Sequence, residues 1–139
     1  MAEALKVQLT SQLITALIST GQSPALLQAK FAEWKSSEPD EHYWFSREVI
    51  GDFGLLHVHM IPQNEPERRK QWESDWKNYR KRRSDRYLIF ANGGPRLGYL
   101  LIDLIEDPGA HLLWERSQKS KLSALERLAD NFIHGGLVP

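Results

Sequence analysis

The chain has 139 residues, of which 41% are hydrophobic and 26% charged, with equal numbers of basic and acidic side chains and no cysteine. This length and composition predict one globular domain over residues 1–139, and the lack of cysteine excludes disulfides, thiolate metal sites and cysteine nucleophiles. The first twenty residues carry an acid at Glu3 and polar breaks in every apolar run, which argues against a signal peptide and a membrane span. We therefore expect a cytoplasmic protein.

The N-terminal part, residues 1–35, is predicted to be helical. Apolar side chains recur there at helical spacing in two runs, and Ser23 followed by Pro24 makes a cap and a first helical residue between them. We therefore expect helices at about 9–20 and 24–35.

Residues 55–133 are predicted to hold a mostly antiparallel sheet of about four strands, a basic helix and a C-terminal helix. Short or alternating apolar runs between turn residues predict the strands, and apolar residues three and four apart predict the last helix. The expected elements are a strand at 55–61, a basic helix after Pro66, strands at 87–91 and 97–105 joined by a turn, a short strand at 111–114, and a helix ending near Gly135. This order predicts an α+β fold.

Basic charge is concentrated in residues 68–86, which read RRKQWESDWKNYRKRRSDR. This run holds nine Lys or Arg against three acids, so the rest of the chain carries nine bases and fifteen acids. Trp72, Trp76 and Tyr79 form an aromatic stripe on the expected helix, and cations with flat rings suit phosphate neutralisation and base stacking. A merely solvated helix face is the alternative. The RNA-binding candidates of this run are Arg68, Arg69, Lys70, Lys77, Arg80, Lys81 and Arg82.

His57-Val58-His59 is the sharpest local motif, because residues two apart on a strand point to the same side. Imidazole exchanges protons near neutral pH, so this pair can supply an acid and a base. The same spacing can supply two metal ligands, with His111 as a third, although no acid is placed to complete a set. Ordinary strand histidines are the third reading.

The junction Arg83-Ser84-Asp85-Arg86 and the later His111 are further candidates. Arg83 and Arg86 can clamp a phosphate and stabilise charge that develops on it. Asp85 can orient an Arg or His or transfer a proton, or it is simply a turn residue at the helix end. His111 follows the turn at 107–109 and is expected in the same sheet as His57.

The catalytic motifs that the chain lacks limit the reactions that it can catalyse. The chain lacks G-x-S-x-G, a Walker-type glycine loop and H-E-x-x-H, so acyl transfer and nucleotide hydrolysis are not supported. RNA cleavage without a metal or other cofactor fits, because the 2′-hydroxyl of the substrate can be the nucleophile while the protein supplies a base, an acid and cations. A non-catalytic nucleic-acid-binding or regulatory module is the alternative.

Five motifs lie in order between Phe31 and Phe132, about three quarters of the chain. They are Phe31-Ala-Glu-Trp34-Lys35, Pro39 with Phe45-Ser46-Arg47-Glu48, His57-Val58-His59, Asp85 before Leu88-Ile89-Phe90, and Leu100-Leu101-Ile102 through Pro108 to His111. Their order resembles the YafO-type toxins of bacterial type II toxin–antitoxin systems. Ser46 and Glu48 stand where the family motif has Gly and Asp, and extra residues separate Pro39 from Phe45.

The resemblance implies an endoribonuclease that cuts mRNA on the ribosome, inhibits growth and is neutralised by a cognate antitoxin. It also implies a compact sheet similar to that of RelE-type toxins. On this reading His57, His59 and His111 are the acid and base groups, and Arg83 and Arg86 stabilise the phosphate. Arg47 joins the RNA-contacting residues on the resemblance alone.

Overall fold

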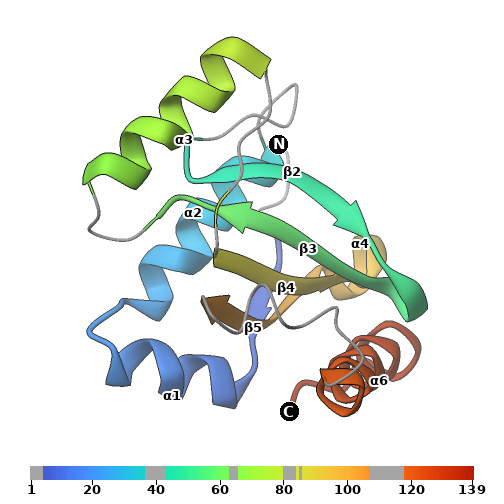
Figure 1. The fold of residues 1–139 in the computed structure, drawn as a ribbon. Coiled ribbons are helices and arrows are strands. Elements are labelled where there is room, and N and C mark those ends of the chain that lie inside the picture. The colour runs from blue at the N-terminus through green and yellow to red at the C-terminus, as the bar shows by residue number, and fades with distance from the viewer. Residues whose placement is uncertain (1–4, 37–42, 63–65, 80–83, 85, 107–117) are drawn as a thin grey trace.

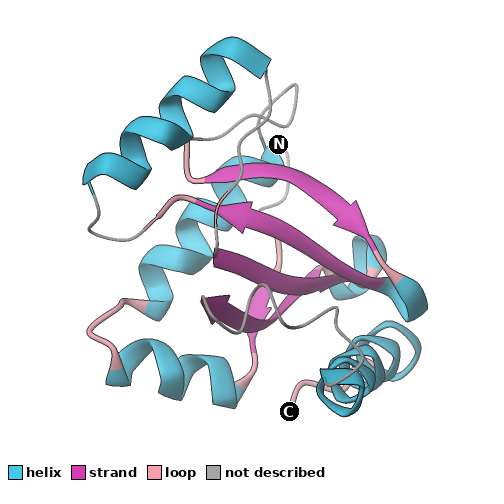
Figure 2. Cartoon of the chain, viewed as in Figure 1, coloured by secondary structure: helices cyan, strands magenta, loops and turns pink. Residues whose placement is uncertain are grey.

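Within the residues that the structure describes, the protein has a mixed five-stranded sheet with helices on both faces (Figures 1 and 2). The structure is a computed structural model that describes residues 5–36, 43–62, 66–79, 84, 86–106 and 118–139. The strands are β1 (Val7–Leu9), β2 (Phe45–Ile50), β3 (Leu55–Met60), β4 (Arg86–Asn92) and β5 (Tyr99–Glu106). Their order is β1-β5-β4-β3-β2, and only the β1–β5 pair is parallel. The predicted α+β fold class is confirmed.

Helices cover both faces of this sheet and one of its ends (Figure 1). They are α1 (Ser11–Ser19), α2 (Pro24–Ser36), the 3₁₀ helix η1 (Asp52–Gly54), α3 (Pro66–Tyr79), α4 (Gly94–Leu97) and α6 (Lys119–Gly135). Helices α1 and α2 pack on one face and α6 on the other, whereas α3 lies beside the end where β3 stops and β4 begins. No helix in the described ranges is long and apolar enough to cross a membrane.

The two predicted N-terminal helices are confirmed, with one correction at their start. Thr10 accepts a hydrogen bond from the Leu13 N–H at 3.1 Å, and Ser23 accepts one from the Leu26 N–H at 3.1 Å, so both helices have side-chain caps. Residue 9 belongs to a strand instead of the first helix, because β1 pairs in parallel with β5 through Val7↔Tyr99. The N-terminal part is therefore not purely helical.

Two hydrophobic cores lie on opposite faces of the sheet. The first joins α1 and α2 to the sheet and is rich in aromatic rings; Phe31 meets Phe90 edge-on at 5.1 Å between centroids, and Trp34 stacks on Phe45 at 4.9 Å. The second joins α6 to the sheet and includes the fully buried Phe132. Burial on both faces explains why the central strand β4 reads as a continuous apolar run.

The motif Phe31-Ala-Glu-Trp34-Lys35 is structural. Its two rings belong to the first core, and the Lys35 side chain is almost fully buried above the Trp34 ring, with Nζ 4.0 Å from the ring centroid. Lys35 Nζ also lies 3.3 Å from a carboxylate oxygen of Glu48. This contact ties α2 to β2.

The predicted β4–β5 hairpin is confirmed, but its connection is longer than a tight turn because it contains α4. The strand expected at 55–61 is β3, which ends at Met60. The edge strand β2 was not predicted. The strand expected at 111–114 lies outside the described residues.

Candidate functional site

His57 and His59 lie side by side on the sheet face that α6 covers in part. Their neighbours across β4 are Ile89 and Tyr87, and both imidazoles are half-buried. The two ring centroids are 6.5 Å apart. The shared face predicted from their spacing is therefore confirmed, because β3 is a regular strand here.

Tyr87 completes a cluster of three rings with the two histidines. Its ring meets that of His59 edge-on at 4.5 Å and that of His57 at 5.5 Å. Tyr87 also packs against the core beneath α6. A phenolic hydroxyl and two imidazoles thus occupy one patch of the sheet surface, and all three groups can donate or accept hydrogen bonds.

The backbone of Ser84 orients His59. Imidazole Nδ1 lies 2.9 Å from the Ser84 carbonyl oxygen and 3.1 Å from the Ser84 nitrogen. The Ser84 hydroxyl in turn donates to the Met60 carbonyl at 2.6 Å, which fixes this turn against the end of β3. Because Nδ1 is engaged by the protein, proton exchange between His59 and a substrate would use Nε2.

His57 is held in its neutral form. Burial, and to a smaller extent the charge of the neighbouring His59, lowers the pKa of the His57 imidazole to about 4. At neutral pH this ring is therefore uncharged. A base and an acid placed together need different protonation states, and the lowered pKa of His57 makes this ring the neutral member of the pair.

Asp103 adds a carboxyl group to the same face. Ile89 of β4 pairs with both His57 and Asp103, so the three residues form one row across three strands. Burial raises the pKa of Asp103, whereas a 2.9 Å hydrogen bond from the Leu104 N–H and the charge of Lys121 lower it. Lys121 belongs to α6 and brings a cation to this row.

Arg86 lies on the opposite face from the histidines, and this corrects the predicted grouping. The alternation along β4 places it with Leu88 and Phe90 on the side of α1 and α2, while Tyr87 faces the histidines. Its Nη1 donates to the Ile61 carbonyl at 3.1 Å and its Nη2 to the Gln22 side chain.

The remaining Arg86 nitrogen is paired with an acid. Nε lies 2.9 Å from a carboxylate oxygen of Glu106 and forms an ion pair with it. The contact does not count as a hydrogen bond, because no acceptor in the described part of the chain is aligned with the Nε–H. Arg86 thus joins the start of β4 to the end of β5 and to the α1–α2 connection. Arg83, Asp85 and His111 lie outside the described residues.

The basic run forms helix α3 as far as Tyr79, and its described cations are exposed. These are Arg68, Arg69, Lys70 and Lys77. Arg69 donates a hydrogen bond from its Nε to the Pro62 carbonyl at 3.0 Å. Arg80, Lys81 and Arg82 lie outside the described residues, and Arg47 is described only as backbone of β2.

Trp72 does not belong to an RNA-stacking stripe. Its side chain is fully buried, and its indole N–H donates to the Tyr43 carbonyl at 2.7 Å. The Tyr43 hydroxyl reaches back to a carboxylate oxygen of Glu73 at 2.6 Å. Trp72 therefore anchors α3 to the segment before β2, and the sequence-based expectation of base stacking is wrong for this residue.

Among the described residues, no three His, Asp or Glu side chains are grouped closely enough to hold a metal ion. The candidate third ligand, His111, is not one of those residues.

Sequence reasoning missed Ser84 as a positioning group, and it missed Tyr87 and Asp103. The alternation of residues 86–92 would place Tyr87 and Ile89 on one face, but only the register between β3 and β4 shows that this is the face of the histidines. Asp103 is an acid inside an apolar run, which is a usable signal for a buried functional group.

A family model described as toxin YafO of a type II toxin–antitoxin system matches residues 33–134. That range contains the ring cluster, helix α3 and nearly all of α6. No curated protein and no solved structure matches the chain.

Proposed function

The chain belongs to the YafO toxin family of type II toxin–antitoxin systems, and we propose that it is an endoribonuclease that cleaves mRNA during translation in the cytoplasm. Membership of the family implies a cognate antitoxin as partner. The observation that carries the proposal is the cluster of His57, His59 and Tyr87, in which one imidazole is neutral and the other is oriented by Ser84.

The proposed reaction uses the 2′-hydroxyl of the RNA as nucleophile. Neutral His57 accepts the 2′-proton while the 2′-oxygen bonds to phosphorus. Protonated His59 gives its Nε2 proton to the 5′-oxygen as the bond from phosphorus to that oxygen breaks. The products are a 2′,3′-cyclic phosphate and a 5′-hydroxyl, and exchange with water restores both imidazoles. This assignment of base and acid follows from the lowered pKa of His57.

Cations are required to balance the charge of the phosphate in the transition state. Lys121 is a described cation on the same face, and we include Arg83 and Arg47 as phosphate-contacting residues. Asp85 is proposed to orient one of these groups, and His111 to join the acid–base pair. Arg86 acts by holding the end of the sheet that carries Ser84 and not by touching the phosphate.

Helix α3 is proposed to hold the RNA. Its exposed Arg68, Lys70 and Lys77, together with Arg80, Lys81 and Arg82, would neutralise backbone phosphates without reading sequence. The helix lies beside the end of the sheet where His59 and Ser84 are found (Figure 1). A strand bound along α3 would thus be delivered toward the ring cluster.

The test is induced expression followed by mapping of new RNA 5′ ends, with and without translating ribosomes. We expect cuts confined to translated mRNA, 5′-hydroxyl ends, and activity that a chelator leaves unchanged. His59→Ala should abolish the cuts and the growth arrest, whereas His134→Ala is the matched control because His134 is an exposed imidazole on α6.

Undiminished cleavage by a His57→Ala/His59→Ala variant would contradict the proposed roles. RNA binding by the wild-type protein without any cleavage would instead favour the non-catalytic binding module, in which the exposed cations of α3 are the whole functional surface. Loss of cleavage on chelation would favour a metal-dependent hydrolase.

A further inference from the structure

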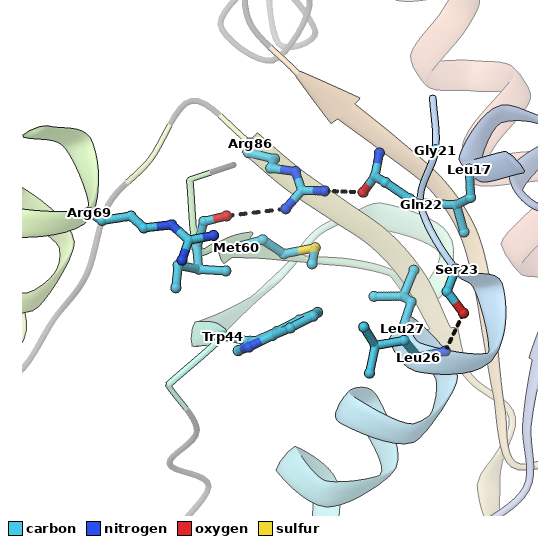
Figure 3. Close-up of a pocket in the computed structure, with 11 residues that line it drawn as sticks. Leu17, Gly21, Gln22, Ser23, Leu26, Leu27, Trp44, Met60, Arg69 and Arg86 are labelled. Atoms are coloured by element: carbon cyan, nitrogen blue, oxygen red, sulfur yellow. Dashed lines mark hydrogen bonds between the residues drawn. The ribbon is translucent and has the colours of Figure 1, made fainter. Parts of the chain in front are cut away.

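A cavity of about 310 Å³ lies on the sheet face opposite the histidines (Figure 3). It is bounded by the α1–α2 connection, by the end of β3 and by the two arginines that reach it from α3 and β4, Arg69 and Arg86. Most of its lining is apolar and includes Leu17, Leu27, Trp44 and Met60. We call this cavity the arginine pocket.

The two guanidinium groups of the arginine pocket are fixed in place by backbone oxygens. Arg86 donates to the Ile61 carbonyl, and Arg69 donates to the next carbonyl along the chain, that of Pro62. Each terminal guanidinium nitrogen carries two N–H groups, so a ligand can use those directed away from these carbonyls. The pocket therefore presents oriented donors without further ordering of the side chains.

The charge of the arginine pocket is incompletely balanced. Burial lowers the pKa of Arg86, Glu106 raises it, and the nearby Arg69 lowers it again by repulsion between like charges. Glu106 pairs with Nε of Arg86, away from the nitrogens that Ile61 and Gln22 orient. A carboxylate entering the pocket would relieve the repulsion between the two arginines and form a forked pair with one of them.

The lining favours some kinds of ligand over others. A nucleobase would place its polar edge against Leu17, Leu27 and Met60, which costs free energy because those edges need hydrogen-bond partners. An isolated phosphate would leave the apolar volume unfilled. A bulky apolar side chain next to a carboxylate satisfies both the apolar walls and the two cations, and such anchors dominate protein–protein interfaces.

We propose that the arginine pocket binds a segment of the cognate antitoxin that presents a bulky apolar side chain beside a carboxylate. The antitoxin is the partner implied by the family, so this inference does not depend on RNA cleavage. Leu26, which is 47% exposed and lines the pocket, forms part of the rim that such a segment would cross.

The first experiment measures the affinity of the full-length toxin for its full-length antitoxin by titration calorimetry. Leu26→Asp places a competing carboxylate at the rim and removes an apolar contact, and we expect it to weaken binding by about tenfold or more. Ile18→Asp is the matched control because Ile18 is 63% exposed on α1 and does not line the pocket. It should retain the wild-type affinity.

Two variants with the same change of charge distinguish antitoxin binding at the pocket from RNA binding by α3. Arg69→Glu should weaken antitoxin binding, whereas Arg68→Glu, one residue away but outside the pocket, should weaken only RNA binding. Both aspartate variants should still arrest growth without the antitoxin, because neither changed residue belongs to the proposed RNA site. Antitoxin binding should also slow hydrogen exchange in residues 17–27 and 60–62.

Equal antitoxin affinities for Leu26→Asp and Ile18→Asp would overturn the proposal. So would reduced RNA cleavage by Leu26→Asp with antitoxin affinity unchanged, since the pocket would then bind RNA. A wild-type protein that binds antitoxin through the pocket but cleaves no RNA would refute the proposed ribonuclease and leave this inference standing.

Discussion

His57 makes the free energy of unfolding depend on pH, because its surroundings lower the pKa of its imidazole. Its folded-state pKa of about 4 lies below the ordinary value of 6.5 because the ring is partly buried beside His59. Between these two pH values the unfolded chain binds more protons than the folded one, so the free energy of unfolding falls as pH falls. The contribution is fully present above pH 6.5.

We predict that His57→Gln flattens this part of the stability profile. Urea unfolding at several pH values between 7 and 4 should show the wild type losing more stability than the variant on acidification. The comparison removes the effect of other titrating groups, which both proteins share. Parallel profiles for the two proteins would mean that the imidazole of His57 is not desolvated.

The role of Arg86 depends on which face of β4 its side chain occupies. From the sequence it stands beside Arg83 and Asp85 and predicts a phosphate clamp. In the structure it shares the face of Leu88 and Phe90, where its guanidinium joins Ile61, Gln22 and Glu106. Neighbouring residues of a strand point to opposite faces, so the side chains of Arg86 and Tyr87 are separated by the sheet although the two residues are adjacent in sequence.

At the scale of elements, the β1–β5 pairing depends on a glycine. Gly98 has φ +72° and follows α4, and a Cβ at this position would collide with the Lys6 carbonyl oxygen, which accepts the Tyr99 N–H at 2.8 Å. Gly94 has φ +84°, but a Cβ there would meet nothing within 4 Å. Gly98 therefore combines a backbone conformation that favours glycine (φ +72°, ψ −145°) with a steric clash, whereas Gly94 has the positive φ without a clash.

We predict that Gly94→Ala lowers the free energy of unfolding by about 1–2 kcal/mol, the cost of the left-handed backbone alone. Gly98→Ala should cost on the order of 3 kcal/mol or more, since β1 must also move away from β5. Chemical denaturation of both variants measures the difference. Similar losses would show that the parallel pairing tolerates the added methyl group.

Helix α3 is expected to contribute to RNA affinity through phosphates alone. If Arg68 and Lys77 each neutralise one phosphate, the slope of log affinity against log salt should shrink by about 0.7 for each Gln substitution. Arg96→Gln is the control, because Arg96 is an exposed cation of α4 at the other end of β4. Filter binding of a short single-stranded RNA between low and physiological salt gives the slopes.

A slope that stays the same for Arg68→Gln and Lys77→Gln would contradict the role of α3. The helix would then be a solvated face, the alternative that its sequence left open. Its position would still be explained by Trp72, whose burial anchors it to the segment before β2.

At the scale of the whole molecule, local patterns predicted most elements of the fold. The capped helices α1 and α2, the alternating strand β3, the β4–β5 hairpin and the amphipathic α6 each carry their signal within their own residues. Strand β1 has three residues and pairs with a strand about ninety positions away, so no local pattern marks it. Strand β2 lies at the edge of the sheet and contains the charged residues Arg47 and Glu48, so it has no continuous apolar run.

The candidate site was predictable only in part, because it depends on register. The spacing of His57 and His59 indicated their common face. Their contacts with Tyr87 and Ser84 and the placement of Asp103 in the same row require the pairing of three strands. The arginine pocket has no sequence signature, since its lining comes from five separate segments.

The ring cluster and the arginine pocket lie on opposite faces of the sheet, so the sheet itself separates them. Under the two proposals above, residues of the pocket rim such as Leu26 can change during evolution without altering the ring cluster, whereas a change of Arg86 affects both sites, because its side chain holds the end of the sheet that carries Ser84. If the antitoxin binds at this pocket, paralogous toxin–antitoxin pairs within one genome would become insulated from each other by changes at its rim, while each toxin keeps the proposed activity. A library randomised at the pocket rim would then be a route to toxins that bind only a chosen antitoxin.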